Sequence, residues 1–309
     1  MTDRVSAIAR SVEALLRRHP VMGSDRSGGL AGPDVLVGLV GRGIQLSRSP
    51  AMHEREAARL GLSCAYVLVD FDALNLDDAD LGMALDAIAS LGFHGVNVTY
   101  PFKQSIIPLL DEVAPDAAVI GAVNTVVFGA RCVGHNTDSW GFAESFRADM
   151  ADVRRDRVVL FGAGGAGSAV GQALIGLGAR QLTVIDRDPA RAQALAGRLA
   201  EGNDAVLDTT EDIATAVTTA DGVVNTTPMG MAKYPGTPFP ASLLRATQWV
   251  ADVVYFPQET ELLRAARAIG CRTLPGIGMA IGQAARAFEL FTGRAADMAA
   301  MAHHFEAAA

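Results

Sequence analysis

A lysine, an aspartate and a glycine-rich loop are the residues of this sequence that could do chemistry together. Lys103 ends the segment Asn97-Val98-Thr99-Tyr100-Pro101-Phe102-Lys103, and Asp138 ends Gly134-His135-Asn136-Thr137-Asp138. Soon afterwards comes Gly162-Ala163-Gly164-Gly165-Ala166-Gly167. Oxidation of an alcohol to a ketone needs a base for the hydroxyl proton beside a dinucleotide that carries the hydride. The three segments together predict this alcohol–ketone dehydrogenase chemistry.

Lys103 is the group expected to move the proton. A neutral lysine takes the hydroxyl proton during oxidation, and the ammonium form polarises and protonates the ketone in the reverse direction. Asp138 is expected to hold the lysine in place and to hydrogen-bond the same substrate. Two plainer interpretations stay open. The lysine could be a solvated residue in the first turn of a helix, which the helix dipole disfavours, and the aspartate could cap a turn or a helix.

The glycine-rich loop has the sequence context of a dinucleotide site. Its glycines are spaced as GxGxxG, after an apolar run at 157–161 and before an expected helix at 168–177. Glycines at such a turn let backbone N–H groups approach a pyrophosphate at the helix N-terminus. The predicted cofactor cradle consists of Gly162, Ala163, Gly164, Gly165, Ala166 and Gly167.

Asp186 follows the next expected strand, at 181–185, and bears on the choice of cofactor. A carboxylate there can accept a hydrogen bond from a ribose 2′-hydroxyl and repels a 2′-phosphate, which favours NAD. Arg187 and Arg191 could partly accommodate a phosphate, whereas Asp188 adds a second negative charge. The alternative is that Asp186 only caps a turn. The sequence therefore predicts NAD, with NADP as the second candidate.

Four polar residues suit a ligand that carries a carboxylate and hydroxyl groups. Ser47 and Ser49 present two hydroxyls just before an expected helix N-terminus, which is a natural place for a carboxylate. Asn97 and Asn124 lie at or beside expected strands and could donate to and accept from ring hydroxyls. Each alone could equally be a capping or turn residue, so the prediction depends on their combination.

The order of apolar segments predicts an α/β fold with two domains. Strands and helices alternate from Val35 onward, which is typical of parallel sheets joined by right-handed crossovers. A hairpin expected at 123–134 adds antiparallel strands to the first domain. The expected strands are 35–40, 64–69, 94–98, 123–128, 131–134, 157–161, 181–185, 223–225 and 250–254; the expected helices are 50–61, 76–91, 168–177, one from Pro189, and 279–291.

These segments divide the chain into four parts. We expect an N-terminal extension and linker (1–33), a mixed-sheet substrate-binding domain (34–138), a Rossmann-type NAD(P)-binding domain (139–274), and a C-terminal helical segment (275–309) that packs back on the substrate domain. Apolar residues at helical spacing near the N-terminus predict a surface-packed helix, with an organellar targeting helix as the alternative. Residues 23–29 are expected to form a flexible linker.

Composition excludes several classes of partner. The 309 residues are 50% hydrophobic and 19% charged, which fits a globular protein with a large core. The net charge of −8 argues against nonspecific binding to nucleic acid or to an anionic membrane. The cysteines match no metal or redox motif and indicate a reducing compartment, so a cytoplasmic location is expected. The histidines lack metal-ligand spacing, and His303-His304 is expected to be solvated.

The motifs occur together in an order that resembles the shikimate dehydrogenase family, and especially its quinate/shikimate dehydrogenase branch. The resemblance runs from about Val35 to the C-terminus and rests on Ser-x-Ser-Pro, Asn-Val-Thr-x-Pro-Phe-Lys, Gly-Ala-Val-Asn-Thr, Asn-Thr-Asp, the glycine loop, Asn225-Thr226-Thr227-Pro228-Met229-Gly230-Met231 and Gln283. It implies reversible oxidation of shikimate to 3-dehydroshikimate, or of quinate to 3-dehydroquinate, by a monomer or homodimer with its active site between the two domains.

The resemblance also implies roles for individual residues. Lys103 and Asp138 would be the catalytic pair, and Ser47 and Ser49 would bind the substrate carboxylate. Asn97, Thr99, Asn124 and Gln283 would hold ring hydroxyls, with Tyr255 lining the same site. The cofactor would be bordered by Thr226, Met229, Val253 and Gly276.

Two departures from the family pattern bear on specificity. NADP-using biosynthetic members carry Asn-Arg-Ser/Thr after the second cofactor strand, where this chain has Asp186-Arg187-Asp188, so the resemblance favours NAD. Quinate-active members can have threonine where Ser49 stands, so serine favours shikimate. Three rivals stay open: a quinate-preferring or NADP-using member, a ligand-sensing module without turnover, and a related two-domain dehydrogenase for amino or folate-type substrates.

Overall fold

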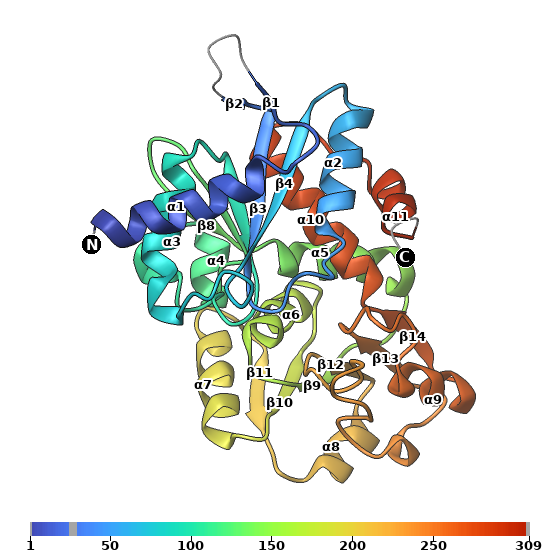
Figure 1. The fold of residues 1–309 in the computed structure, drawn as a ribbon. Helices are drawn as coiled ribbons and strands as arrows, with labels where there is room; N and C mark the ends of the chain where they lie inside the picture. Colours follow the sequence, from blue (N-terminus) through green and yellow to red (C-terminus); the bar gives the residue numbers. More distant parts are fainter. Residues whose placement is uncertain (1, 25–29, 307–309) are drawn as a thin grey trace. The chain divides into compact units, whose positions relative to one another are not determined.

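The backbone forms two compact units in the computed structural model, which describes residues 2–24 and 30–306 (Figure 1). Unit 1 comprises the described residues up to 118 together with 122–137 and those from 284 onward, and unit 2 comprises 119–121 and 138–283. Residues 2–24 therefore group with unit 1, not as a separate extension. Residues 275–283 group with unit 2, so the helix α10 (Ile277–Thr292) is divided: 277–283 belong to unit 2 and 284–292 to unit 1.

Unit 1 is built on a mixed six-stranded sheet in the order β4-β3-β5-β7-β8-β6. β3 pairs in parallel with β4 and β5, whereas β7 pairs antiparallel with β5 and β8, as the predicted hairpin requires. Its elements are α1 (Thr2–Leu16), β1 (Gly23–Ser24), β2 (Leu30–Ala31), β3 (Val35–Gly41), α2 (Ser49–Arg59), β4 (Cys64–Asp70), the 3₁₀ turn η1 (Asp78–Asp80), α3 (Leu81–Ser90), β5 (Gly95–Val98), η2 (Ile107–Leu109), β6 (Glu112–Val113), α4 (Pro115–Ile120), β7 (Thr125–Val127), β8 (Val133–His135) and α11 (Met298–Glu306).

Unit 2 has a six-stranded, entirely parallel sheet in the order β11-β10-β9-β12-β13-β14. Numbered from the first strand of the unit, this order is 3-2-1-4-5-6, the arrangement of a dinucleotide-binding Rossmann sheet. Its elements are α5 (Thr137–Met150), β9 (Arg157–Phe161), α6 (Gly165–Gly176), β10 (Gln181–Ile185), α7 (Pro189–Ala200), β11 (Val206–Thr209), α8 (Ile213–Thr219), β12 (Gly222–Asn225), η3 (Ala241–Leu243), β13 (Trp249–Asp252), α9 (Glu261–Ile269), β14 (Arg272–Pro275) and α10 (Ile277–Thr292).

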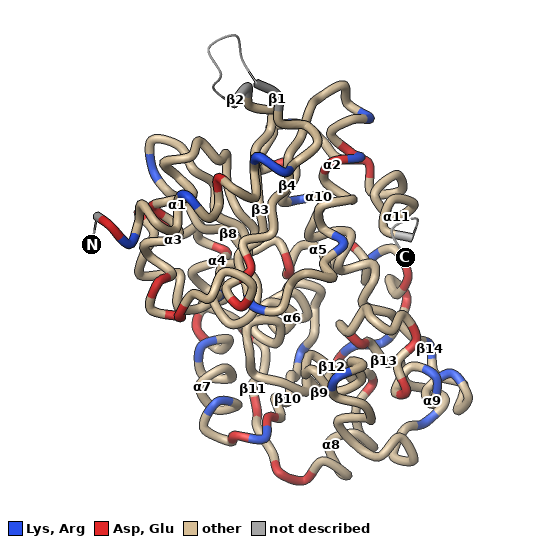
Figure 2. The backbone as a smooth tube through the Cα atoms, viewed as in Figure 1, with Lys and Arg blue, Asp and Glu red and all other residues tan. Residues whose placement is uncertain are grey.

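The strands of both sheets are mainly apolar and largely buried. β3, β5, β7, β10 and β12 carry no charged residue, and Figure 2 shows red and blue concentrated on helices and loops. Parallel strands buried on both faces need such continuous apolar runs. This is why the sequence located β9 and β10 at the residues where the structure places them.

The N-terminal helix packs on unit 1, as the surface-packed interpretation predicts. Ile8, Val12 and Leu16 of α1 are buried in the same apolar cluster as residues of α3, and Arg4 Nη2 lies 2.6 Å from a carboxylate oxygen of Asp80. Residues 23–24 pair antiparallel with 30–31, so the ends of the expected linker are structured; 25–29 lie outside the described residues. No helix in the described ranges is long and apolar enough to span a bilayer.

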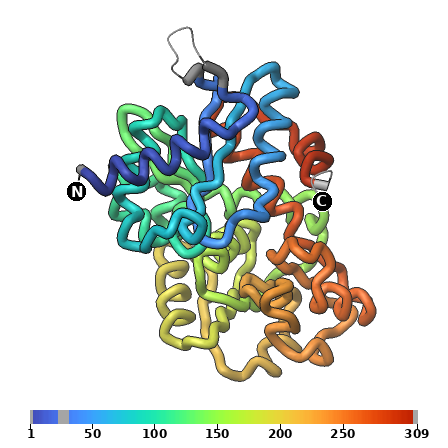
Figure 3. The backbone as a smooth tube through the Cα atoms, in the orientation of Figure 1, coloured from blue at the N-terminus to red at the C-terminus, as the bar shows by residue number. Residues whose placement is uncertain are grey.

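Two expected segments need correction. The helix predicted to begin at residue 76 begins at Leu81, because Asp77 and Asp80 form a capping box around one 3₁₀ turn. The alanine-rich tail folds as α11, which lies beside α2 (Figure 3). Its Met301 and Phe305 are buried. His303 is exposed but His304 is half-buried, so only the first matches the expectation of a solvated pair.

His53 on α2 is buried without hydrogen bonds. Its ring is 1% exposed, neither ring nitrogen has a partner, and it packs against the ring of Tyr66 at a centroid distance of 4.8 Å. Burial disfavours the charged form and lowers the pKa of His53 to about 3. The folded protein therefore holds this histidine neutral at a pH where the unfolded chain protonates it.

This difference makes stability depend on pH. The unfolded histidine gains its proton below a pKa of about 6.5, so the native state loses about 2 kcal/mol of unfolding free energy between pH 7 and pH 5 on this account. We expect His53→Leu to remove this loss. Urea unfolding of wild type and variant at both pH values measures it, with exposed His303→Gln as the control. An equal pH dependence in wild type and His53→Leu would contradict the assignment.

Candidate active site

The lysine segment follows β5 as a series of hydrogen-bonded turns. Phe102 N–H donates to the carbonyl of Thr99, and Val123 N–H donates to the carbonyl of Lys103 at 2.7 Å. Lys103 is half-buried, as is Thr99, and no α-helix begins at this lysine. The interpretation of Lys103 as a solvated lysine at a helix start therefore does not describe the structure, because the segment is tied to the strand that leads into β7.

The two asparagines predicted to hold ring hydroxyls are buried in one polar cluster of unit 1. Asn97 Nδ2 lies 3.0 Å from Thr125 Oγ1, and Thr125 Oγ1 lies 3.0 Å from Asn124 Oδ1. Asn124 Oδ1 also accepts from Thr137 N–H at 2.8 Å. Asp138, which is 5% exposed, follows Thr137 as the second residue of α5. The cluster thus fixes Thr137, the residue directly before the catalytic candidate Asp138.

The serine pair lies at the start of α2, where the sequence placed it. Ser47 Oγ is 3.2 Å from Ser49 Oγ and accepts from Ser49 N–H at 3.3 Å. Between them, the guanidinium of Arg48 stacks on the ring of Phe305 at 4.8 Å and donates to the Phe305 carbonyl at 3.3 Å. The C-terminal helix therefore fixes the loop that carries both hydroxyls, a contact between distant parts of the chain that has no signal in the local sequence.

The glycine loop of unit 2 lies between β9 and β12, where the strand order reverses. In open parallel sheets, ligands bind outside the carboxyl ends of the strands at this reversal. Gly162 has φ +103°, and a Cβ there would lie 2.8 Å from Thr226 Oγ1. A Cβ on Gly167 would lie 1.9 Å from the Gly162 carbonyl oxygen. Only glycine fits at both positions, because the backbone of this turn packs directly against itself and against Thr226.

The Asp186 carboxylate, at the end of β10, holds the glycine loop in place. One carboxylate oxygen accepts from Ala163 N–H at 2.7 Å and the other accepts from Asp188 N–H at 3.0 Å. The capping interpretation and the ribose interpretation are therefore compatible, because each oxygen can accept a further hydrogen bond. Arg187 is exposed, and a Cβ on Gly164 would lie 3.7 Å from Arg191 Nη2.

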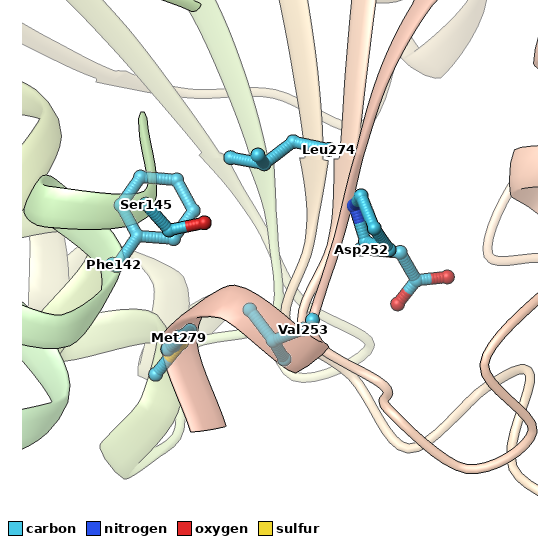
Figure 4. Close-up of a pocket in the computed structure, with 8 residues that line it drawn as sticks. Phe142, Ser145, Asp252, Val253, Leu274 and Met279 are labelled. Atoms are coloured by element: carbon cyan, nitrogen blue, oxygen red, sulfur yellow. The ribbon is translucent and has the colours of Figure 1, made fainter. Parts of the chain in front are cut away.

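Two further predicted cofactor residues line a small pocket at the carboxyl ends of β13 and β14. Val253 and Gly276 line it, and Figure 4 shows Phe142 and Ser145 of α5 and Met279 of α10 on one side, with Val253 and Asp252 across from them. The complete lining is Phe142, Ser145, Asp252, Val253, Leu274, Pro275, Gly276 and Met279. Sequence reasoning missed Phe142, Ser145 and Met279, since they come from helices whose periodicity indicates only burial.

The remaining predicted residues are placed as follows. Thr226 donates to the Phe161 carbonyl at 2.7 Å, and the Met229 carbonyl accepts from Asn225 Nδ2 at 2.9 Å, so both belong to the turn after β12. Tyr255 is exposed, and Gln283 is half-buried with its amide donating to the Ala280 carbonyl at 2.9 Å. Among the described residues, no group of histidine, cysteine, aspartate or glutamate is arranged to hold a metal ion.

Asp252 is a buried acid that sequence reasoning did not select. It is 2% exposed, and its carboxylate accepts from Asn225 Nδ2 at 2.9 Å, from Val254 N–H at 3.0 Å and from Thr260 Oγ1 at 2.8 Å. In Figure 4 this carboxylate points away from Phe142 and Met279. Burial raises the pKa of Asp252 to about 6, although its hydrogen bonds act in the opposite direction. Asp252 therefore joins the turn after β12 to α9.

Unit 2 has the strand order, the reversal point and the glycine cradle of a dinucleotide-binding enzyme domain, and unit 1 carries a lysine beside buried amides. The chain matches the "Shikimate dehydrogenase substrate binding domain" over residues 39–126, "Shikimate / quinate 5-dehydrogenase" over 144–230, and "Shikimate 5'-dehydrogenase C-terminal domain" over 276–303. These matches fall in both units and in the shared helix.

Comparisons with whole proteins agree. The chain is 53% identical over 267 residues to a shikimate dehydrogenase (NADP(+)) of Streptomyces avermitilis, covering 85% of this chain and 91% of that protein. It is 48% identical over 276 residues to a quinate/shikimate dehydrogenase (NAD(+)) of Corynebacterium glutamicum, covering 88% and 98%. The solved quinate dehydrogenase of that organism in complex with NAD superposes with a TM-score of 0.84 at 48% identity, covering 88% of this chain and 99% of that chain. The chain belongs to the shikimate dehydrogenase family.

The raised pKa of Asp252 predicts a measurable effect on stability. The carboxyl group prefers its neutral form when folded, so its contribution to stability is fully present below the unfolded pKa of 3.8 and is lost as the pH rises through about 6. We expect wild type to lose about 2 kcal/mol relative to Asp252→Asn between pH 4 and pH 7.

Chemical unfolding of both proteins at pH 4, 5, 6 and 7 measures this difference. Asp204→Asn, which replaces an exposed aspartate, is the matched control and is expected to show no such trend. A stability difference between wild type and Asp252→Asn that stays constant across this range would contradict the assignment.

Proposed function

We propose that this protein is a shikimate dehydrogenase that catalyses the reversible, NAD-dependent oxidation of shikimate to 3-dehydroshikimate. One observation carries the proposal. The chain is 53% identical to a shikimate dehydrogenase and carries the lysine, the buried aspartate, the serine pair and both asparagines that the proposed chemistry uses. A quinate-preferring enzyme is the second candidate, since a relative 48% identical is named for both substrates.

Lys103 is the proposed acid–base group and Asp138 its partner. The basic residues of this chain number 26, yet only two, Lys103 and Lys233, are lysines. A guanidinium does not lose its proton in proteins, so an arginine could not accept the hydroxyl proton. Of these two side chains, only lysine can both accept and donate the proton. A bound nicotinamide would supply the hydride chemistry; the chain's own residues bind, orient and move the proton.

The substrate is held through its carboxylate and its hydroxyls in this proposal. Ser47 and Ser49 supply two hydroxyls at the N-terminus of α2, where the helix dipole favours an anion. Asn97, Thr99 and Asn124 supply the amide and hydroxyl groups that meet the ring hydroxyls. Tyr255 and Gln283 complete the same site.

The cofactor lies on the glycine loop, with Thr226, Met229, Val253 and Gly276 as its further neighbours. NAD is the proposed preference, because the Asp186 carboxylate and Asp188 would oppose a 2′-phosphate. Arg187 and Arg191 keep NADP as the second candidate, in line with the NADP named for the Streptomyces relative. We further propose that the enzyme acts in the cytoplasm as a monomer or homodimer.

Initial rates test the activity directly. Reduction of NAD and of NADP is followed with shikimate and with quinate, four combinations on one purified sample. We expect turnover on shikimate, with a higher kcat/KM for NAD than for NADP. Cofactor binding without turnover in any combination would favour the ligand-sensing module. Binding of amino or folate-type ligands in preference to shikimate, in a competition assay, would favour the related dehydrogenases.

Removal of the lysine tests the proposed mechanism. We expect Lys103→Ala to lower kcat by about 10²–10⁴, the range for a positioned acid–base group, while the Kd for NAD stays unchanged. Lys233→Ala, on an exposed loop, is the matched control because it removes the other lysine. Steady-state rates and fluorescence titration of NAD separate the two effects. Near-normal turnover by Lys103→Ala would remove this residue from the mechanism.

A further inference from the structure

Tyr66 of β4 and Thr125 of β7 do not belong to the predicted site, yet they contact its buried amides. Building on the proposed function, we propose that Tyr66 and Thr125 are positioning residues for the substrate, acting through a hydrogen-bond chain that fixes the carboxamides of Asn97 and Asn124. This hydrogen-bond chain lies entirely within unit 1. Its members are all less than 7% exposed: Tyr66, Asn97, Asn124, Thr125 and Thr137.

The chain runs from β4 through β5 and β7 to the start of α5. Tyr66 Oη donates to Asn97 Oδ1 at 2.9 Å, and Asn97 Nδ2 donates to Thr125 Oγ1 at 3.0 Å. Thr125 Oγ1 donates to Asn124 Oδ1 at 3.0 Å, and Asn124 Nδ2 donates to Thr137 Oγ1 at 2.9 Å. These four hydrogen bonds therefore all run in one direction, from donor to acceptor, toward Thr137, the residue that precedes Asp138.

Backbone groups fix the direction of this chain. The atom of Asn124 that faces Thr137 N–H at 2.8 Å must be the carbonyl oxygen, because an N–H only donates. The atom of Asn97 that faces the Asn124 carbonyl at 3.4 Å must be the amide nitrogen, because a carbonyl only accepts. With both carboxamides oriented, Thr125 has one arrangement that satisfies its neighbours: it accepts from Asn97 and donates to Asn124.

The chain also decides what each asparagine can offer a ligand. Both amide hydrogens of Asn97 are engaged, which leaves its oxygen with one further acceptor site. Asn124 has one amide hydrogen left, since its other hydrogen meets Thr137. Asn97 is therefore set to accept from a substrate hydroxyl, and Asn124 is set to donate to one. Backbone groups set these two orientations, and the hydroxyls of Tyr66 and Thr125 add the side-chain hydrogen bonds that hold each carboxamide in position.

Tyr66 is itself held rigidly. Its backbone N–H donates to Glu54 Oε1 at 3.0 Å, and its ring packs against the buried ring of His53. A chain of buried, oriented hydrogen bonds is strengthened by the low local dielectric, and losing one member leaves its neighbours unsatisfied. Small changes at Tyr66 and Thr125 are therefore expected to alter substrate binding through Asn97 and Asn124, although neither residue contacts the substrate in this proposal.

Three variants on the full-length protein test the proposal. Tyr66→Phe removes one hydroxyl and is expected to lower kcat/KM for shikimate by about 3- to 10-fold, the effect of one net hydrogen bond. Thr125→Val breaks two hydrogen bonds and is expected to lower it by about 10- to 100-fold. Thr125→Ser keeps the hydroxyl and is expected to remain within about 3-fold of wild type, on the same hydrogen-bond scale.

The Kd for NAD and the melting temperature are measured for each variant, and Thr292→Val, on α10, is the matched control because its hydroxyl bonds only within its own segment. An effect on shikimate KM and kcat with unchanged NAD binding supports the proposal. Wild-type kcat/KM in Tyr66→Phe and Thr125→Val overturns it, as does a Thr125→Ser enzyme as impaired as Thr125→Val.

If wild type binds and oxidises shikimate while these variants match it, the function stands and the positioning role falls. If wild type does neither, both fall.

Discussion

The carboxamide of Asn124 is the interaction on which the rest of unit 1 depends. Its oxygen accepts the backbone N–H of Thr137, and its backbone carbonyl accepts from Val98 N–H at 2.7 Å. One residue therefore joins the end of β5 to the first turn of α5. Because a buried carboxamide is expensive to leave unsatisfied, these segments cannot shift independently of one another. The segments leading to Lys103 and Asp138 are both connected to this residue.

Unit 2 depends on a different constraint, the close approach of backbone to backbone at the reversal of strand order. The hydroxyl of Thr226 bridges to the carbonyls of Phe161 and Gly162, and only glycine fits opposite it. Asp252 and Asn225 continue the same arrangement across the ends of β12 and β13. The polar side chains at this edge are thus engaged with one another and with the backbone of the glycine loop.

Arginine and lysine are used differently in this chain. Arginine serves the structural ion pairs of unit 1, such as Arg42 with Asp72 and Asp78, and Arg59 with buried Glu56. Its planar, permanently charged group suits these bidentate and branched contacts. Lysine is almost absent from the chain. The acid–base role proposed for Lys103 requires a group that can be neutral, which a guanidinium cannot be.

The sequence by itself determined the local features. Apolar runs located β9 and β10, Asp188 and Pro189 began α7 as cap and first residue, and the glycine spacing predicted the cofactor loop, because periodicity, capping and turn chemistry act over a few residues. Only the tertiary structure decided the pairing of Tyr66 with Asn97, the burial of Asp252 and the packing of α11 on α2. These contacts join residues distant in the chain, and their energies arise from burial and long-range hydrogen bonds that leave no pattern in the local sequence.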